Sequence, residues 1–423
     1  MNVLWLMNII VPKAAQAIGA PVRPFGGWTV SQIEAMQQQK EISLTVCCVS
    51  DAVQSTQKVT IDGIHYVIFA EKKDSYIAAF RALLQQCAPD ILQVFGTEQR
   101  TSNRLLQEMP LDKTVISIQG LAHLCAEVYL FDLPRKYRHI SLLKAGMKQL
   151  YCADILAQNQ KKFAREGIDE IASLQRVQHV IGRTNWDEAC TKRINPQVQY
   201  HFCNETLRNS FYDGAWDETT CVRHSILVSQ ASYPIKGLHY ILKELPRILQ
   251  KYPDTMLCIA GEKPLSTGNR LLDYGVRYFF EYQAYCASLI RKNHLEKHVQ
   301  FLGLQSEQEM KEQYLKANVF LSCSTLENES NSISEAHMLG VPVVSSFVGG
   351  VTERIAHGQD GFFYPLTESY MLPFYIEKLF DDADLCRTFS KNGRARARLL
   401  HDKEKNMQTL LGIYRSIMQS DTL

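Results

Sequence analysis

The chain has 423 residues, a length that suits two or three domains or one enzyme with two lobes. Hydrophobic residues make up 46% and charged residues 21%, a balance typical of a folded protein with a sizeable core. Lys and Arg number 46 against 44 for Asp and Glu, so the net charge of +2 gives no general attraction to nucleic acid, and we expect no nucleic-acid partner.

The twelve cysteines indicate a reducing environment. None forms a C-x-x-C motif, and most stand inside apolar runs, as Cys258 and Cys323 do. We therefore expect buried free thiols rather than disulfides or a zinc site.

The first residues, VLWLMNIIV followed by PKAAQA, have two interpretations. The apolar run is compatible with a signal peptide, although no Lys or Arg precedes it. It fits equally well a buried first strand that leads to a glycine loop at Gly26-Gly27. Since no apolar run approaches the ~20 residues that span a bilayer, we expect a cytoplasmic protein.

Short apolar runs alternate with helix-like stretches through the first half of the chain, which predicts a parallel sheet covered on both faces. The runs that predict strands are 3–11, 43–50, 65–70, 91–96, 114–120 and 178–183. A helix is predicted over 75–86, where apolar residues recur at helical spacing.

The same alternation begins again in the second half. Strands are predicted at 224–230, 255–261, 299–303, 319–324 and 341–346. A helix with apolar residues at helical spacing follows the first of these and contains Pro246, which removes a helical hydrogen bond. Ser306 and Glu309 form a capping box, and a short helix is predicted from about Ser332.

Two successive runs of this kind predict an α/β protein with two doubly wound, Rossmann-like domains. We place the domains at 1–205 and 206–400. A final helix over 401–423 carries an apolar stripe that must be buried, and we expect it to cross back to the first domain. The stripe consists of Met407, Leu410, Leu411, Tyr414, Ile417 and Met418.

The usual nucleotide-binding signatures are absent, since neither G-x-G-x-x-G after a strand nor G-x-x-x-x-G-K-[ST] occurs. Dinucleotide dehydrogenases and P-loop NTPases are therefore disfavoured. A doubly wound domain still offers a ligand crevice at the carboxyl ends of its strands.

Residues 321–365 are the most informative segment. Glu327 lies in the loop after a predicted strand, and Glu335 lies eight residues later in the following helix. If Ser332 caps that helix, free backbone N–H groups around 330–333 point into the crevice and suit a phosphate, with Asn331 and Ser332 as donor-binding residues. The two carboxylates suit sugar hydroxyls. The alternative is structural: Ser332 and Glu335 form a capping box, and Glu327 is one acid in a polar loop.

This segment resembles the E-x7-E region of glycosyltransferase family 4, written E-G-F-G-x-x-x-x-E-A-M-A-x-G-x-P-V-V-x-S-x-x-G-G. The matching positions are Glu327, Glu335-Ala336, Leu339-Gly340, Pro342-Val343-Val344, Ser346, Gly349-Gly350, Glu353 and Gly361. PIKGLHYIL (234–242) is similar to the E-K-G-x-x-x-L-I stretch of that family. The N-terminal half resembles the family more loosely, through Gly26-Gly27 and the order of its strands.

The resemblance implies a GT-B fold, a nucleoside diphosphate sugar such as a UDP-sugar as donor, net retention and no obligatory metal or other cofactor. Glu327 would hold hydroxyls of the donor sugar and Glu335 the ribose hydroxyls. Lys236 would neutralise the departing diphosphate, because a compact ammonium charge strongly stabilises developing negative charge in a cleft that excludes water. Gly26 and Gly27 would let the backbone approach the phosphates. The structural alternatives are a solvated turn lysine and a plain βα turn.

Three positions depart from the family pattern. Ala231 stands where the family often has arginine, with Gln230 before it as the remaining polar contact for the donor, and Glu327-Asn328-Glu329-Ser330 replaces E-G-F-G. Gln119 stands where the family often has a histidine near the sugar. Because glutamine cannot take a proton, we expect Gln119 to orient a hydroxyl while the phosphate of the donor receives the proton of the acceptor.

Two further segments bear on partners. PIKG together with GRT-x-WD is similar to enzymes of bacterial surface polysaccharide assembly, and Arg183 within the second motif either faces the cleft or forms a helix-capping or hinge salt bridge. The segment 135–165 is rich in Lys and Arg with interleaved leucines, which suits contact with the inner face of the plasma membrane near a lipid-linked acceptor, or else a solvated basic face.

We therefore expect transfer of a sugar from a nucleotide sugar to a glycan or lipid-linked acceptor. Two other functions remain open. One is a GT-B relative that epimerises or phosphorolyses sugars, and the other is a non-catalytic subunit that binds sugar nucleotides. The sequence names neither the sugar, the base nor the acceptor.

Overall fold

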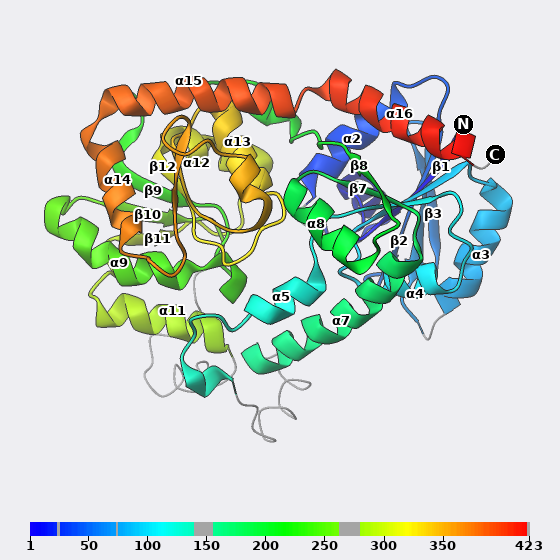
Figure 1. Ribbon diagram of the computed structural model, residues 1–423, viewed down its shortest axis with the longest axis horizontal. Helices are drawn as coiled ribbons and strands as arrows, with labels where there is room; N and C mark the ends of the chain where they lie inside the picture. Colours follow the sequence, from blue (N-terminus) through cyan, green and yellow to red (C-terminus); the bar gives the residue numbers. More distant parts are fainter. Residues whose placement is uncertain (23–25, 73–74, 139–154, 262–279, 421–423) are drawn as a thin grey trace. The chain divides into compact units, whose positions relative to one another are not determined.

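The computed structural model describes residues 1–22, 26–72, 75–138, 155–261 and 280–420 (Figure 1). The chain forms two compact units. Unit 1 comprises Met1–His123, Arg165–Asn209 and Leu400–Leu423, and unit 2 comprises Leu124–Ala164 and Ser210–Leu399. Each unit is an α/β structure built on one mainly parallel sheet, as the sequence predicts for a GT-B protein.

The expected boundaries at 205/206 and 400/401 fall within a few residues of these limits, but the segment 124–164 belongs to unit 2 rather than to the first domain. Long-range contacts explain the difference. Lys243 Nζ donates to Asp132 Oδ2 at 2.7 Å, and the N–H of Leu156 donates to the carboxylate of Glu281 at 2.9 Å. Such contacts leave no periodic signal in the sequence.

Unit 1 contains an eight-stranded sheet in the order β3-β4-β2-β1-β5-β6-β7-β8, in which only the β3–β4 pair is antiparallel. Its strands are β1 (Asn2–Met7), β2 (Ser43–Ser50), β3 (Gln57–Ile61), β4 (Ile64–Ala70), β5 (Ile91–Phe95), β6 (Thr114–Ser117), β7 (His179–Gly182) and β8 (Gln199–Phe202). Its helices are α1 (Pro12–Ala17), α2 (Gly27–Gln37), α3 (Ser75–Cys87), α4 (Arg100–Gln107), α8 (Asn185–Ile194) and α16 (Lys403–Ser420). The helices α5 (Ala122–Val128) and α7 (Leu156–Arg176) run across the unit boundaries.

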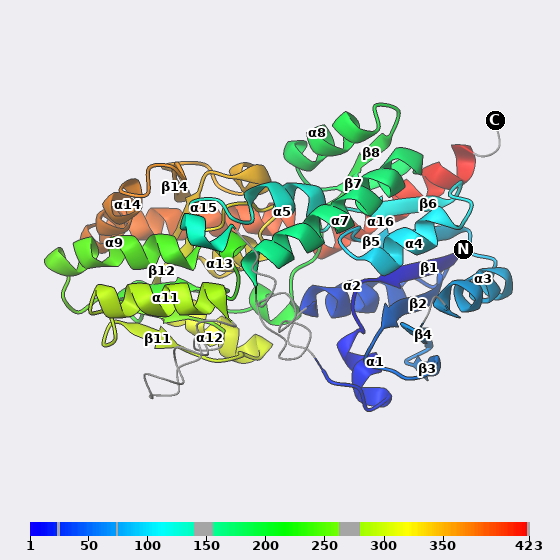
Figure 2. The same ribbon diagram turned by 90° about the horizontal axis from the view of Figure 1, so that it is seen from below.

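Helix α16 is an integral part of unit 1, as its apolar stripe predicts. It lies alongside α2 in both views of the fold (Figures 1 and 2). Five of the six stripe residues are buried, but Met418 is 37% exposed and Ile413 is buried in addition. The buried residues of α16 in the core of unit 1 are Met407, Leu410, Leu411, Ile413, Tyr414 and Ile417.

A buried chain of polar groups also connects α16 to the sheet. The indole N–H of Trp5 in β1 donates to the hydroxyl of Tyr414 at 2.9 Å, and that hydroxyl donates to the side-chain carbonyl of Gln93 in β5. The amide of Gln93 donates onward to Ser117 Oγ in β6 at 2.6 Å. Each polar group is paired, so the contact fixes one register of the helix on the sheet at little desolvation cost.

Unit 2 contains a six-stranded sheet in the order β11-β10-β9-β12-β13-β14, with every pairing parallel. Its strands are β9 (Val222–Val228), β10 (Met256–Ile259), β11 (Val299–Phe301), β12 (Ala317–Ser322), β13 (Val343–Ser346) and β14 (Gly361–Tyr364). Its helices are α9 (Leu238–Lys251), α11 (Glu281–Lys292), α12 (Glu307–Lys316), α13 (Asn331–Leu339), α14 (Met371–Asp381) and α15 (Ala383–Leu400). Short 3₁₀ turns occur at Arg135–Tyr137, Asn209–Tyr212, Pro234–Lys236 and Gly349–Glu353.

The local signals of the second half agree with the structure. Helix α9 continues through Pro246 to Lys251, and its apolar face is buried. The capping box at α12 is present, because Glu309 N donates to Ser306 Oγ and Ser306 N donates to the Glu309 carboxylate. Figure 2 shows α9 and α11 side by side on one face of the unit 2 sheet.

The chain order of the strands creates one switch point in each sheet. In unit 1, β1 lies between β2 and β5, and in unit 2, β9 lies between β10 and β12. In unit 1 the chain leaves β1 toward one face of the sheet and β5 toward the other, and in unit 2 the same holds for β9 and β12. A crevice therefore opens at the carboxyl ends of these strands. Ligands of doubly wound folds bind at such points.

The described residues contain no helix that is long and apolar enough to cross a membrane. Most of the basic segment 135–165 lies outside the described residues, since 139–154 are not described. Among the described residues all eleven cysteines are free thiols, but only six of them are buried; the other five, including Cys258, are partly exposed.

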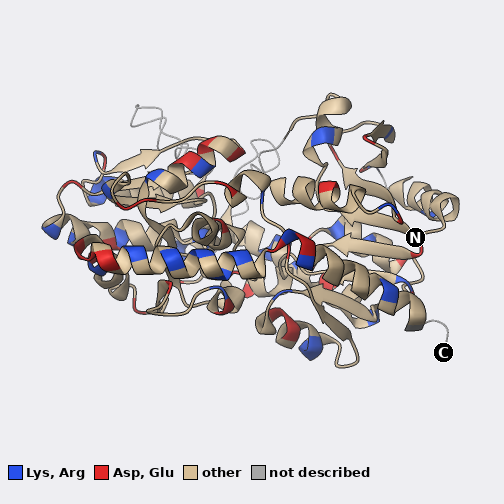
Figure 3. Cartoon of the chain, turned by 90° about the horizontal axis from the view of Figure 1, so that it is seen from above, with Lys and Arg blue, Asp and Glu red and all other residues tan. Residues whose placement is uncertain are grey.

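Lys and Arg residues recur along α15 in unit 2 (Figure 3). Several are neutralised locally: Arg387 pairs with Glu218 and Asp384, and Arg396 pairs with Asp360. Charges of both signs are therefore mixed on this helix, in keeping with the near-neutral total.

Candidate functional site

The switch point of unit 2 brings together two loops that are far apart in the sequence. One loop follows β9 and contains Lys236, and the other follows β12 and contains Glu327. Lys236 Nζ donates to Glu327 Oε1 at 2.6 Å, and the N–H of Thr325 donates to the carbonyl of Ile235 at 2.7 Å. The two residues predicted to be catalytic in this half are therefore in direct contact.

Local geometry explains why glycine follows the lysine. The 3₁₀ turn Pro234–Lys236 ends at Gly237, whose φ of +67° disfavours any other residue. A Cβ at Gly237 would lie 1.9 Å from the carbonyl oxygen of Cys323. The turn therefore sits directly on the end of β12, and this close approach aims Lys236 at the next loop.

The environment of Lys236 favours its charged form. Its side chain is only 18% exposed, and burial alone would lower its pKa, but the adjacent Glu327 carboxylate and the Tyr233 hydroxyl raise the pKa above its usual value. The ammonium group has three protons, and both Glu327 and the Tyr233 hydroxyl form hydrogen bonds with it, which leaves one proton for a further anion. Ser324 Oγ also donates to Glu327 Oε1, at 2.6 Å, which fixes the carboxylate.

The paired glycines after β13 hold the Glu327 loop from the other side. Gly350 N donates to the carbonyl of Glu327 at 3.1 Å, and a Cβ at Gly349 would lie 1.9 Å from that same oxygen. Ser346 Oγ donates to the carbonyl of Ser324 at 2.6 Å. Three strand-end loops thus interlock, and the glycine at position 349 follows from close backbone contact.

Helix α13 begins one residue before the predicted start. Its N-cap is Ser330, without a side-chain cap, so the expectation that Ser332 caps the helix is wrong. The first N–H groups that bond within the helix are those of Ile333 and Ser334, which both reach the carbonyl of Ser330. The N–H groups of Asn331 and Ser332 therefore have no partner within the helix, which leaves an anion-binding helix start in place.

The side chains of this helix start differ in their environment. Asn331 Oδ1 is buried and accepts no hydrogen bond from any residue that the structure describes. Ser332 contributes its carbonyl to the hydroxyl of Tyr314 at 3.0 Å, and Glu335 is buried one turn further on. Gln230, in contrast, is exposed in the loop after β9 and has no hydrogen bond among the described residues.

The predicted glycines of unit 1 lie at the start of α2. Gly26 is the N-cap of this helix, with φ +76°, and its carbonyl accepts hydrogen bonds from the N–H and Oγ1 of Thr29. Gly27 is the first helical residue. A Cβ at Gly26 would lie 2.1 Å from the Cδ1 of Ile9, so the left-handed turn here suits glycine alone.

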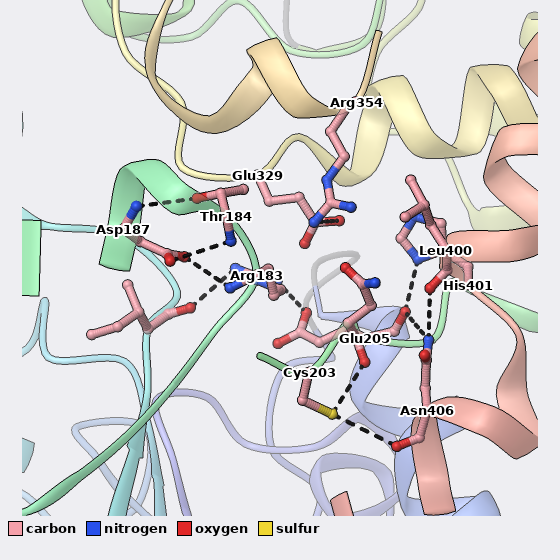
Figure 4. Close-up of polar contacts among 12 residues, drawn as sticks. Arg183, Thr184, Asp187, Cys203, Glu205, Glu329, Arg354, Leu400, His401 and Asn406 are labelled. Carbon is pink, nitrogen blue, oxygen red and sulfur yellow. Dashed lines mark hydrogen bonds and ion pairs between the residues drawn. The ribbon is translucent and has the colours of Figure 1, made fainter. Parts of the chain in front are cut away.

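Gln119, the third predicted catalytic residue, is held in a buried polar cluster at the carboxyl ends of β6 and β7. Its Nε2 donates to Glu205 Oε1 at 2.5 Å, and Arg183 Nη1 pairs with Glu205 Oε2 at 2.6 Å (Figure 4). Arg183 also donates to the carbonyl of Ile118 at 3.1 Å. Of the open alternatives for Arg183, the structure shows a salt bridge within unit 1, and Thr184 with Asp187 supplies the helix cap.

The sequence analysis missed three ionisable residues near the carboxyl ends of β5 and β6 in unit 1. Glu98 follows β5, His123 stands at the start of α5, and Glu170 lies on α7. Burial, reinforced by the nearby Glu170 charge, raises the pKa of Glu98 to about 8. The strand-end motif VFGTE offered a signal for Glu98, but nothing in the sequence connects Glu170 with His123, which is 47 residues away.

Residues 223–396 match the family described as glycosyl transferases group 1. The match lies entirely within unit 2 and includes the loops that contain Lys236 and Glu327. Among curated relatives, the capsular polysaccharide biosynthesis glycosyltransferase CapM of Staphylococcus aureus is 26% identical over 184 residues, 44% of each chain. The chain spans less than half the length of the first curated relatives that it matches.

Solved structures support the same fold over nearly the whole chain. Sucrose-phosphate synthase from Thermosynechococcus elongatus has a TM-score of 0.72 at 14% identity and covers 99% of this chain and 100% of its own. HepE of Anabaena, solved in complex with UDP-glucose, has a TM-score of 0.66 at 14% identity, with 98% and 99% covered. At this level of identity the likeness concerns the fold.

In unit 2, a buried ion pair stands at the position where the loop after β12 departs from the family pattern. Glu329 stands in place of the phenylalanine of E-G-F-G, and its Oε1 lies 3.3 Å from Arg354 Nη2 (Figure 4). The two side chains are 0% and 2% exposed. The pair joins the loop after β12 to the turn after β13, at a position where the family pattern has an apolar residue.

Arg354→Met should therefore destabilise unit 2 strongly, because it removes a buried cation that lies 3.3 Å from the buried Glu329 carboxylate. We expect a loss of about 3–5 kcal/mol in the free energy of unfolding. Urea denaturation followed by circular dichroism measures this loss. The double variant Glu329→Met/Arg354→Met removes both charges and should recover much of it, whereas equal stability of the single and double variants would contradict this explanation.

Proposed function

We propose that the protein is a retaining glycosyltransferase that transfers a sugar from a nucleoside diphosphate sugar, most simply a UDP-sugar, to a glycan or lipid-linked acceptor. The observation that carries this proposal is the Lys236–Glu327 contact at the switch point of unit 2. The ammonium group of Lys236 suits the diphosphate of such a donor, and the carboxylate of Glu327 suits the hydroxyls of its sugar.

Each polar group at this point has a role in the proposal. The N–H groups of Asn331 and Ser332 bind a phosphate, and Glu335 accepts hydrogen bonds from the ribose hydroxyls. Glu327 accepts hydrogen bonds from the donor sugar. Lys236 compensates the negative charge that grows on the diphosphate as the bond to the sugar breaks, so its contribution is larger in the transition state than in the ground state.

Relatives support the choice of substrate. HepE of Anabaena binds UDP, glucose and UDP-glucose in its solved complexes, and CapM is named for capsular polysaccharide biosynthesis. We place the reaction in surface polysaccharide assembly, on the cytoplasmic side of the membrane. The free thiols suit that compartment, and the basic segment 135–165 would contact the membrane surface there.

The experiment that tests the proposal is a thermal-shift screen of the full chain against UDP-glucose, UDP-galactose, UDP-N-acetylglucosamine and GDP-mannose. A ligand present at 100 times its Kd stabilises a protein by about 2.7 kcal/mol, which gives a clear shift in Tm. We expect one nucleotide sugar to stabilise the chain and to release its nucleoside diphosphate on incubation. A chain that none of these donors stabilises would overturn the proposal.

Transfer should also persist in EDTA. No D-x-D pair follows a strand to hold Mg²⁺ against a diphosphate, whereas Lys236 and the start of α13 can supply positive charge. The rate of nucleoside diphosphate release should be the same with and without an excess of EDTA. Loss of activity on chelation, restored by Mg²⁺ or Mn²⁺, would contradict metal-independent transfer.

A further inference from the structure

Unit 2 has an open cavity of about 620 Å³ along one face of α15. The opposite wall is the segment 215–219, which precedes β9. The volume lies within the range of sites that hold drug-sized ligands, roughly 300–1,000 Å³. All residues that line the cavity belong to unit 2, and neither Lys236 nor Glu327 of the candidate donor site is among them.

A row of cationic side chains from α15 lines the cavity. Its members are Arg387, Lys391, Arg394 and Arg398. Residues at this spacing lie on the same face of a helix, so the row faces the cavity along most of the length of α15, where Lys and Arg recur (Figure 3).

Carboxylates neutralise only one end of this row. Arg387 pairs with Glu218 at 2.8 Å and with Asp384 at 2.5 Å. Asp217, the other carboxylate of the lining, accepts hydrogen bonds from the N–H and the hydroxyl of Thr219. The middle and the far end of the row therefore stay positive.

The remaining three cations lack a carboxylate partner. The ion pairs of α15 with described residues belong to Arg387 and Arg396, while Lys391, Arg394 and Arg398 have none. Arg394 makes one long hydrogen bond, from Nη2 to the carbonyl of Gly214 at 3.4 Å. Its pKa lies below the usual value, because burial disfavours the charge and Arg398 repels it. An anion in the cavity would relieve this repulsion.

A structural role accounts for Arg394 but not for its neighbours. Gly340 is the C-cap of α13, and a Cβ there would lie 2.8 Å from the Cδ of Arg394, so the arginine packs on the end of that helix. A cation is favourable near a helix C-terminus. Lys391 and Arg398 are exposed and form no such contact, so the helix end does not explain their charge.

Helix α13 also separates the cavity from the candidate donor site. It begins at Asn331 beside the Glu327 loop and ends at Leu339, whose carbonyl accepts the N–H of Trp216 in the cavity wall at 2.7 Å. Nine helical residues rise roughly 13 Å. The two sites therefore lie at opposite ends of α13, and ligands can occupy both at once.

We propose that this cavity binds a phosphate-bearing ligand, with Lys391, Arg394 and Arg398 as the groups that hold its anionic oxygens. Two guanidinium groups and one ammonium group suit a multivalent anion, because each guanidinium can donate two parallel hydrogen bonds to phosphate oxygens. The cavity is larger than a phosphate ion, so the ligand has room for a further group. This inference goes beyond the proposed function and does not rest on it.

The test is a calorimetric titration of pyrophosphate into the full chain in the presence of saturating UDP. UDP fills the candidate donor site, so the remaining heat reports the cavity. We expect binding to the wild type and a Kd at least about tenfold higher in Arg394→Gln/Arg398→Gln, because charge-assisted hydrogen bonds are lost. Added NaCl should weaken the binding, since salt screens exposed charges.

Two further variants separate loss of the site from loss of the fold. Lys292→Gln/Lys297→Gln removes two exposed cations of unit 2 outside the cavity and should bind pyrophosphate like the wild type. Lys391→Gln/Arg398→Gln keeps the contact of Arg394 with Gly340 and should also raise the Kd at least about tenfold, with the wild-type Tm and UDP affinity.

Vesicles distinguish the two sources of a phosphate group. Pyrophosphate binding without sedimentation on vesicles of phosphatidylcholine and phosphatidylglycerol assigns the cavity to a soluble phosphate ester. Sedimentation that needs phosphatidylglycerol and is lost in Lys391→Gln/Arg398→Gln assigns it to a lipid headgroup.

A wild type that binds neither probe would overturn the proposal. So would cavity variants that bind like the wild type, or a control variant that loses the same affinity. A wild type that does not bind UDP would contradict the proposed function instead, and the comparison of pyrophosphate binding between the wild type and the cavity variants would still decide this inference.

Discussion

Lys236→Ala is expected to lower kcat by roughly 10²–10³-fold while changing the donor Kd far less. The magnitude is that of removing one preorganised electrostatic group from an active site. The physical reason is that the diphosphate gains charge as the bond to the sugar breaks, and Lys236 is held 2.6 Å from Glu327 at the switch point, where that charge would develop. Steady-state kinetics with the donor identified in the screen, together with calorimetric titration of UDP, measure the two quantities separately.

Lys243→Ala is the matched control. Lys243 lies on α9 of the same unit and also forms an ion pair, at 2.7 Å with Asp132, but away from the loops after β9 and β12. Its replacement should leave both kcat and Kd unchanged. If Lys236→Ala retained the wild-type kcat, or if both variants lost the same activity, Lys236 would be a structural residue of the turn.

Truncation after Lys403 is expected to have the largest effect on folding. It removes most of α16, whose buried residues belong to the core of unit 1 around Trp5 and Phe95. Each large apolar side chain contributes roughly 1.5–3 kcal/mol on burial before conformational entropy is subtracted. Several such losses exceed the net stability of a typical domain, so unit 1 should unfold or aggregate.

Truncation after Ser420 provides the control, because it removes only the last three residues. Size-exclusion chromatography, near-ultraviolet circular dichroism and binding of a hydrophobic dye should show native behaviour for this variant and exposed apolar surface for the shorter one. A chain ending at Lys403 that stays monomeric, with the wild-type Tm, would show that α16 adds nothing to the core.

The sequence predicted the central strands of both sheets, but of the four edge strands it predicted only β11. The strands β1, β2, β4 and β5 are buried on both faces, and their continuous apolar runs are visible in the sequence. The strands that were missed, β3, β8 and β14, are all terminal strands in their sheets. β3 and β8 are half-exposed and carry no apolar run, because an edge strand has one neighbour and a solvated side.

The sequence predicted only part of the candidate site, because it shows which residues follow a strand but not which residues meet in the folded chain. Lys236, Glu327 and Glu335 follow predicted strands or lie in the next helix, so their general location was visible from the sequence. The ion pairs around the two switch points were not visible from the sequence. They join Glu329 to Arg354, Arg183 to Glu205, and Glu170 to His123. Each pair joins two loops or helices that only the folded sheet brings together, and no local periodicity encodes it.

The most direct test of the central claim is a calorimetric titration of UDP into the full chain and into Glu335→Ala. We predict one site per chain, with a Kd about 10- to 100-fold higher in the variant, the cost of losing hydrogen bonds to a charged group. Glu377→Ala, which removes a carboxylate from α14 of the same unit, should bind UDP like the wild type. Absence of UDP binding to the wild type, or equal affinity in Glu335→Ala, would contradict a nucleotide-sugar site at the switch point of unit 2.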